Sequence, residues 1–207
     1  MRIESVKNQP DRAGRFSVQL EDGTVMRLYK QTIQDFGIYP GAELSDEDLK
    51  RLQDAAEKMS AKMRAVRIVS ASSVSKKDLE QRLVYKGESP ENARQAVAWM
   101  CQLDLLDDLE TARQVVNRCI SKGYGLSRAK QALYEKKIPK EYWQEVLTDY
   151  PDQQDSIVQF LANRLEDDRD PKQVRRAIDA LLRRGHTYSQ IHRALETLAV
   201  DDQFPEE

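Results

Sequence analysis

The acidic pair and the histidines of this 207-residue chain are residue types that acid–base or metal chemistry uses. Asp107 and Asp108 are adjacent carboxylates, as general acid–base catalysis could require. They also open a predicted helix, where carboxylates cap free amides and meet the positive end of the helix dipole, so we interpret them as caps. His186 and His192 are six positions apart, on different faces of the last predicted helix or its approach. We expect surface histidines and no metal site.

The cysteines and glycines predict no cofactor either. Cys101 and Cys119 lie in apolar-periodic stretches, which is typical of reduced core thiols in a reducing compartment. None of the eight glycines belongs to a GxxxxGK or GxGxxG phosphate-binding loop. With no catalytic constellation found, the sequence predicts a binding protein that is not an enzyme and carries no cofactor.

Positive charge concentrates between Thr111 and Lys140, which we name the basic segment. Eight lysines and arginines stand there against one acid, Glu135, which leaves +7 in a chain whose net charge is −2. Such a surface suits a polyanion or an acidic protein groove. The candidate partner- or DNA-binding residues are Arg113, Arg118, Lys122, Tyr124, Arg128, Lys130, Lys136 and Lys137.

Two interpretations of the basic segment stay open. The predicted buried stripe of its second helix consists of Leu126, Ala129 and Leu133. Lys130 and Lys137 lie beside this stripe and could extend over apolar neighbours without binding a partner. Arg128 is predicted to point away from the stripe, which makes it the preferred ligand candidate.

The elements that must position these residues begin with an alternating N-terminal segment. Apolar residues two apart and an Asp-Gly turn signal within Glu21–Thr24 predict strands at 2–7, 14–21 and 24–30. Tyr39-Pro40-Gly41 then breaks the chain. Residues 1–44 are therefore predicted as a small antiparallel β element.

From Ser45 onward the sequence predicts helices. Ser45 and Asp48 form a capping box for a long helix to about Ala71. Its predicted apolar stripe is Leu49, Leu52, Ala56, Met59, Met63, Val66 and Val69. Further helix starts are predicted at Ser75, Ser89-Pro90, Asp107, Pro139, Pro151, Asp170-Pro171 and Thr187, and stops at Gly87, Gly123 and Gly185. The charged link over 167–170 is expected to be solvated.

The helical pattern recurs with an offset of 50 and then 48 residues, which indicates stacked repeats. Each copy has a longer helix, a helix ending in basic residues, and a third, shorter helix. We predict a mostly α fold with three tandem three-helix repeats in an elongated, curved stack. The predicted domains are 1–44, 45–107 with the first repeat, 108–150 with the second and 151–207 with the third.

Several motifs resemble the RecX family of recombination regulators. The segments are Leu103–Asp108 (LDLLDD), Ala112–Arg113, Lys122–Arg128 (KGYGLSR), Arg128–Ile138 and, in the first repeat, Asp78–Gly87. The likeness is best over about residues 60–150. Thr111, Ala129 and Ala132 depart from the family pattern, since they stand where it usually has an aromatic, a branched apolar residue and a glutamate.

The resemblance implies a protein that binds the RecA filament on single-stranded DNA. RecX-like proteins lie in the filament's helical groove and inhibit filament growth, ATP hydrolysis and strand exchange without doing chemistry. A rod of helical repeats presents an extended surface suited to such a groove. A weak direct contact with DNA is compatible with the basic segment.

Two other functions remain as alternatives: a general helical nucleic-acid-binding protein that uses the basic segment on phosphates, and a scaffold of repeats. The chain is 33% charged and 40% hydrophobic, which fits repeats that bury one face each. The sequence shows neither a signal peptide nor an apolar run long enough for a membrane span, so we expect a cytoplasmic monomer with no membrane partner.

Overall fold

The computed structural model describes residues 1–165 and 171–201 and contains two compact units. The first unit comprises 1–72 and 76–106, and the second comprises 73–75 and the chain from Asp107 onward. The link predicted over 167–170 lies outside the described residues.

A three-stranded antiparallel sheet opens the first unit. Its strands are β1 (Ile3–Val6), β2 (Arg15–Leu20) and β3 (Val25–Tyr29), in the order β1-β2-β3. Val18 pairs with Val6 on one side and with Met26 on the other. At the turn, Gly23 has a φ of +83°, as the Asp-Gly signal requires. The predicted strands are confirmed.

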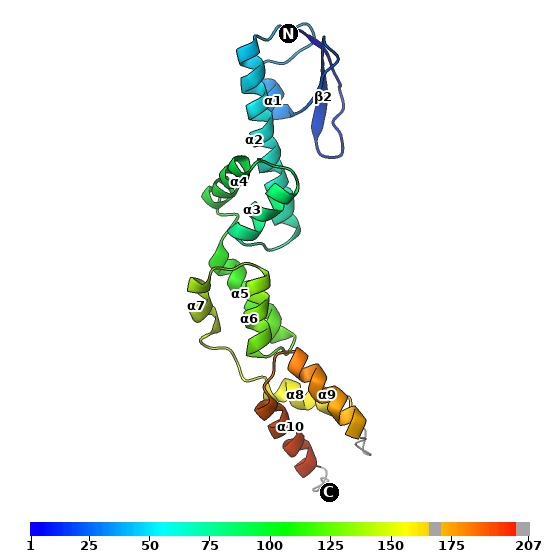
Figure 1. Cartoon of the computed structure of the whole chain (residues 1–207), viewed down its shortest axis with the longest axis vertical. Helices are drawn as coiled ribbons and strands as arrows, with labels where there is room; N and C mark the ends of the chain where they lie inside the picture. Colours follow the sequence, from blue (N-terminus) through cyan, green and yellow to red (C-terminus); the bar gives the residue numbers. More distant parts are fainter. Residues whose placement is uncertain (166–170, 202–207) are drawn as a thin grey trace. The chain divides into compact units, whose positions relative to one another are not determined.

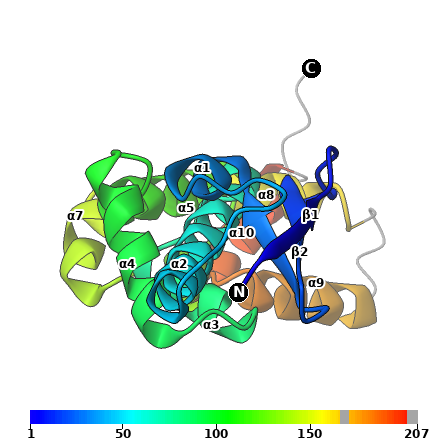
Figure 2. The same cartoon turned by 90° about the horizontal axis from the view of Figure 1, so that it is seen from above.

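Two helices follow the sheet. The short α1 (Lys30–Asp35) was not predicted, and α2 (Asp46–Ala71) is the long helix predicted from the capping box. The Ser45 hydroxyl accepts a hydrogen bond of 3.0 Å from the Asp48 amide. Figures 1 and 2 show the sheet and α1 beside the first half of α2. The core buried there consists of Ile3, Val18, Leu20, Leu28, Ile38, Ala42 and Leu52.

The predicted apolar stripe of α2 is only partly right. Leu52 is fully buried, but Met59 and Met63 are half-buried and the other fully buried positions are Ala61 and Ala65. The stripe shifts because the second half of the helix packs against α4 (Pro90–Gln102) rather than the sheet. Small side chains let two helix backbones approach closely there.

The helix pair α3 (Lys76–Tyr85) and α4 completes the first repeat. Ser89 caps α4 by accepting from the Asn92 amide at 3.1 Å, with Pro90 in the first turn as predicted. Gly87, between the two helices, has a φ of +92°. The local start and stop signals are therefore confirmed here.

The second unit holds the other two repeats. The second repeat contains α5 (Asp108–Ser121), α6 (Leu126–Glu135) and a short 3-10 turn, η1 (Lys140–Tyr142), which runs into α7 (Trp143–Leu147). The third contains α8 (Gln154–Ala162), α9 (Pro171–Arg183) and α10 (Tyr188–Asp201). The start predicted at Pro151 lies three residues before α8.

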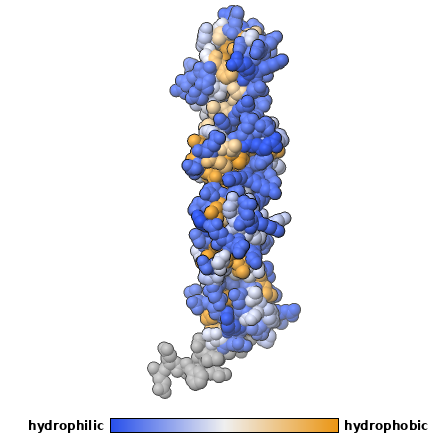
Figure 3. All heavy atoms as spheres, turned by 90° about the vertical axis from the view of Figure 1, so that its left-hand side faces the viewer, coloured by the Kyte–Doolittle hydropathy of each residue, from blue (hydrophilic) through white to orange (hydrophobic). Residues whose placement is uncertain are grey.

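The fold is thus mostly helical, with three groups of three helices after a small antiparallel sheet, as predicted. The elongated, curved arrangement and the four domain boundaries stay predictions. No helix of the described residues is long and apolar enough to cross a membrane. The face in Figure 3 is mostly hydrophilic, with small separate hydrophobic patches.

Candidate partner-binding site

The turn between α5 and α6 is the local structure that positions the basic segment. Gly123 has a φ of +62°, and its amide donates to the Ile120 carbonyl oxygen at 2.9 Å, which ends α5. The next amide, of Tyr124, donates to Cys119 at 3.0 Å. A left-handed residue just past a helix is the usual place for glycine. The predicted stop at Gly123 is confirmed.

Gly125 is needed for a different reason, because its φ of −75° suits any residue. A Cβ on Gly125 would lie 2.1 Å from the Gly185 carbonyl oxygen, and one on Gly185 would lie 2.3 Å from the Arg128 backbone nitrogen. The Gly125 amide donates to the Arg184 carbonyl oxygen at 2.9 Å. The α5–α6 turn and the α9–α10 turn therefore meet backbone to backbone. The sequence showed two Gly-containing turns but not that they touch.

His186 strengthens this contact between repeats, and Tyr150 binds the same α5–α6 turn from within the second repeat. His186 is 4% exposed, with Nε2 3.0 Å from the Gly123 carbonyl oxygen, so the prediction of a surface histidine was wrong for this residue. Its approach to the α5–α6 turn, distant in sequence, explains its burial. His192 is exposed as predicted. The Tyr150 hydroxyl donates to the Tyr124 carbonyl oxygen at 2.6 Å.

Burial governs the protonation of both side chains. Burial lowers the pKa of His186 below its ordinary value of 6.5, against the opposing effect of the hydrogen bond to Gly123. Its Nδ1 is buried without a hydrogen-bond partner among the described residues. Burial also raises the pKa of Tyr150 to about 12. The contact is therefore built from a neutral imidazole and a protonated phenol.

Three of the eight candidate residues have free charges. Arg118, Lys122 and Lys130 are exposed, and within residues 1–165 and 171–201 no carboxylate forms an ion pair with them. Lys122 Nζ lies 5.9 Å from the centre of the Tyr124 ring, which is half-buried. These three cations are the ones available to a partner.

Arg113 and Arg128 are instead paired with acids of their own repeat. Arg113 lies 2.7 Å from Glu145, and Arg128 lies 2.9 Å from Glu135. Arg128 is 32% exposed in its side chain, and its backbone touches Gly185. The ion pair with Glu135 makes Arg128 less available to a partner than Lys130, so its preference as a ligand candidate stays a prediction that the structure weakens.

Lys136 and Lys137 have structural contacts. The Lys136 carbonyl oxygen accepts from the Ser75 hydroxyl at 2.7 Å, and its Nζ donates to the Ser73 carbonyl oxygen at 3.2 Å. Lys137 has a φ of +56°, the conformation that glycine adopts at the same place in the other repeats. Both residues are half-buried. Neither is presented to a partner as Lys130 is.

Thr111, one of the departures from the RecX pattern, is buried at the start of α5. It is 6% exposed, and its hydroxyl lies 2.7 Å from the Asp107 carbonyl oxygen and 3.3 Å from that of Val74. Asp107 itself caps α5, since its carboxylate accepts from the Leu109 amide at 2.7 Å. The interpretation of Asp107 as a cap is confirmed.

Two apolar residues on α6 are exposed, which the sequence pattern did not predict. Leu126 is 40% exposed, although it was assigned to the buried stripe, and Tyr134 is 71% exposed. Only Ala129 and Leu133 of that stripe are fully buried. Adjacent helix positions cannot face the same side, so the burial of Leu133 was a usable signal for Tyr134. The free cation Lys130 and two exposed apolar side chains therefore share α6.

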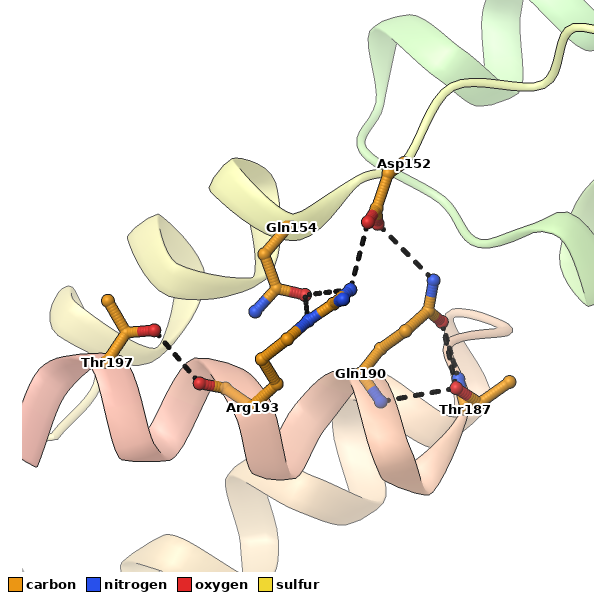
Figure 4. A network of polar contacts seen from close by, with 6 residues as sticks. All are labelled: Asp152, Gln154, Thr187, Gln190, Arg193 and Thr197. Atoms are coloured by element: carbon orange, nitrogen blue, oxygen red, sulfur yellow. Dashed lines mark hydrogen bonds and ion pairs between the residues drawn. The ribbon is translucent and has the colours of Figure 1, made fainter.

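In the third repeat, the side chain of Arg193 on α10 is held by contacts with residues at the start of α8. Figure 4 shows Arg193 of α10 pointing toward Asp152 and Gln154 at the start of α8, and its guanidinium lies 2.9 Å from the Asp152 carboxylate. Gln190 contacts the same carboxylate at 3.5 Å, and Thr187 caps α10. The positive charge of Arg193 is therefore locally compensated.

The described residues contain no group of three or more histidines, cysteines or acids that could hold a metal ion. Cys101 and Cys119 are both free thiols, the first half-buried and the second buried. Burial raises the pKa of Cys119, while Arg128, Lys122 and Arg118 oppose that shift. Arg128, Lys122 and Arg118 therefore all lie near the Cys119 thiol at the end of α5. The arrangement suits recognition of an anionic surface.

Comparison with known proteins gives consistent relatives. No family model matches the chain. A protein of Clostridioides difficile named regulatory protein RecX is 26% identical over 209 residues, which cover 98% of each chain. A Vibrio parahaemolyticus protein of the same name is 24% identical over 143 residues, covering 68% of this chain and 92% of its own.

Two solved structures share the fold. One, described as a crystal structure of regulatory protein RecX, has a TM-score of 0.63 at 17% identity and covers 94% of this chain and 98% of its own. The other, RecX from Lactobacillus salivarius, has a TM-score of 0.58 at 20% identity over 70% and 99% of the two chains. With the full-length sequence match and the motifs around the α5–α6 turn, these likenesses make the chain similar in sequence and in fold to proteins named regulatory protein RecX.

Proposed function

We propose that this protein binds the RecA filament on single-stranded DNA, in its helical groove, and inhibits filament growth, ATP hydrolysis and strand exchange. The observation that carries the proposal is the set of free cations on the middle repeat, Arg118, Lys122 and Lys130. The likeness to proteins named regulatory protein RecX supports a role in regulation. The protein acts in this proposal by binding, without chemistry of its own.

The composition of the α6 surface favours a protein groove over naked phosphates. Tyr134 and Leu126 are exposed beside Lys130, and protein interfaces are enriched in such aromatic side chains at their centre. Aromatic side chains also contribute most when they are desolvated by a partner. The cations would then steer the encounter with an anionic filament, and the apolar residues would hold the contact.

A second function, direct nucleic-acid binding through the same cations, makes a different prediction about salt. Three cations neutralising phosphates of a single strand would give a log–log salt slope of about −2. Binding that depends on Tyr134 as well would retain affinity at salt concentrations where phosphate contacts alone fail. The two functions therefore separate in one titration.

The experiment is RecA ATPase activity on single-stranded DNA with and without this protein, alongside its binding to the same DNA without RecA. The proposal expects inhibition that saturates with added protein, and little binding to the naked strand at physiological salt. Equal affinity for naked and RecA-coated DNA would favour general nucleic-acid binding. An unchanged ATPase rate across the titration would refute the proposed function.

A further inference from the structure

The first unit contains a cleft of about 420 Å³ that includes no residue of the basic segment. It is formed by the sheet, the second half of α2 and α3. Five of the side chains that line it are cations: Arg15, Arg64, Arg67, Arg82 and Lys86. None of its described lining residues is an acid. The cleft therefore concentrates positive charge at a concave surface.

Three of these arginines are fixed in place by carboxylates outside the lining. The pairs are Arg15 with Asp11 at 2.7 Å, Arg64 with Glu88 at 2.9 Å, and Arg82 with Asp78 at 2.8 Å. Glu88 and Asp78 are almost fully buried, and Arg64 also donates to the Lys86 carbonyl oxygen. Such partners reduce the entropy that the arginines would lose on binding a ligand.

Arg67 is held differently, by neutral groups. Its Nη2 donates to the Tyr29 hydroxyl at 2.7 Å, and its Nε donates to the Met63 carbonyl oxygen at 3.2 Å. In the described part of the chain no carboxylate pairs with Arg67 or with the ammonium of Lys86. Five cations against three carboxylates leave the cleft with two uncompensated positive charges.

We propose that this cleft is a binding site for a phosphate group. Converging guanidinium groups match the planar, multidentate geometry of phosphate recognition, and preorganised arginines are the usual means of achieving it. The volume lies within the roughly 300–1,000 Å³ of small-ligand sites. It suits an inorganic phosphate, a mononucleotide or one phosphate of a strand. No lining acid repels such a ligand.

This site is independent of the proposed RecA contact, since its residues lie in the first unit and the contact surface lies in the second. A test on the protein alone therefore distinguishes the two. The full chain is titrated with inorganic phosphate, adenosine monophosphate or a short single-stranded oligonucleotide, with ionic strength held constant by sodium chloride. The midpoint of thermal unfolding is followed, because a ligand that binds the folded state raises it.

The first variant is Arg67→Gln, which removes the cation that neutral groups hold. The second is Lys86→Gln, which removes an exposed ammonium that contacts no other described side chain. The matched control is Arg51→Gln, on the same helix and 69% exposed in its side chain. Loss of a charge-assisted contact is expected to weaken binding about tenfold or more for Arg67→Gln. Lys86→Gln should weaken binding in the same direction, and Arg51→Gln should match the parent.

A midpoint raised by phosphate or the mononucleotide identifies a free ligand, and one raised only by the oligonucleotide identifies strand phosphates. In both cases the shift must shrink in Arg67→Gln and Lys86→Gln. If Arg67→Gln does not fold, Lys86→Gln alone decides the matter. No shift with any of the three probes, or equal shifts in the variants and the parent, overturns the proposal.

Discussion

Gly125→Ala tests the backbone contact between the second and third repeats. The φ of Gly125, −75°, is accessible to alanine, so without a neighbour this change should be neutral or stabilise by about 0.4–1 kcal/mol. The structure predicts the opposite. The new Cβ would lie 2.1 Å from the Gly185 carbonyl oxygen and 2.4 Å from its carbon, both parts of a backbone that cannot rotate away.

The cost follows from what must move. The turns must separate by more than 1 Å to restore contact distances, which is overpacking that typically costs about 1–3 kcal/mol. Separation also weakens the hydrogen bond from the Gly125 amide to Arg184, worth about 1 kcal/mol. We therefore expect the free energy of unfolding of the second unit to fall by about 2–4 kcal/mol.

The assay is urea unfolding followed by tryptophan fluorescence in a Trp99→Phe background, so that Trp143 of the second unit reports alone. Gly87→Ala is the control, because its φ is +92° and a Cβ there meets nothing within 4 Å. Its cost, that of a left-handed alanine at about 1 kcal/mol, falls in the first unit, so the unfolding midpoint reported by Trp143 should stay at that of the parent. A Gly125→Ala midpoint at or above that of the parent would refute the close contact.

Two further predictions concern the same contact. Gly123→Val should lower stability by about 1 kcal/mol or more, because φ is +62° and its Cβ would lie 2.9 Å from that of Ser156; an unchanged urea midpoint would contradict this. His186 has a folded-state pKa below 6.5, so the unfolded chain binds more protons, and stability should fall as the pH drops below about 6.5 and level off below the folded pKa. His186→Gln should flatten this part of the stability profile, and an unchanged profile would show that another group titrates.

Local signals were enough to predict the elements of the fold. Ser45, Ser89 and Asp107 each accept a hydrogen bond from an amide two or three residues away, so their capping roles are visible in sequence. Gly87 and Gly123 end helices for equally local reasons. The short α1 was missed because it has no capping side chain and directly follows β3.

The site depended on contacts that sequence spacing does not reveal. His186 is buried against the Gly123 carbonyl oxygen, 63 residues away in the sequence. Gly125 likewise meets Gly185, a residue far from it in the sequence. Arg128 and Glu135 are seven residues apart, about two helical turns, a spacing at which their ion pair was not anticipated. The predicted cluster of eight residues is thereby reduced to three free cations.

The central claim is that Arg118 and Lys130, rather than Arg128, carry the contact with the RecA filament. Reversing Arg128 would break its ion pair and place a second carboxylate beside Glu135, so binding and stability would change together. Arg118 and Lys130 are exposed and have no described ion pair, so Arg118→Glu with Lys130→Glu should leave the unfolding midpoint near that of the parent.

The direct measurement is inhibition of the DNA-dependent RecA ATPase by the Arg118→Glu/Lys130→Glu variant, with Arg51→Glu as the control on an exposed helix of the first unit. Two reversed contacts at an anionic surface, at about 1 kcal/mol or more each, predict that the concentration for half-inhibition rises at least tenfold. The control should inhibit like the parent. A double variant that inhibits as well as the parent across the titration would contradict the claim.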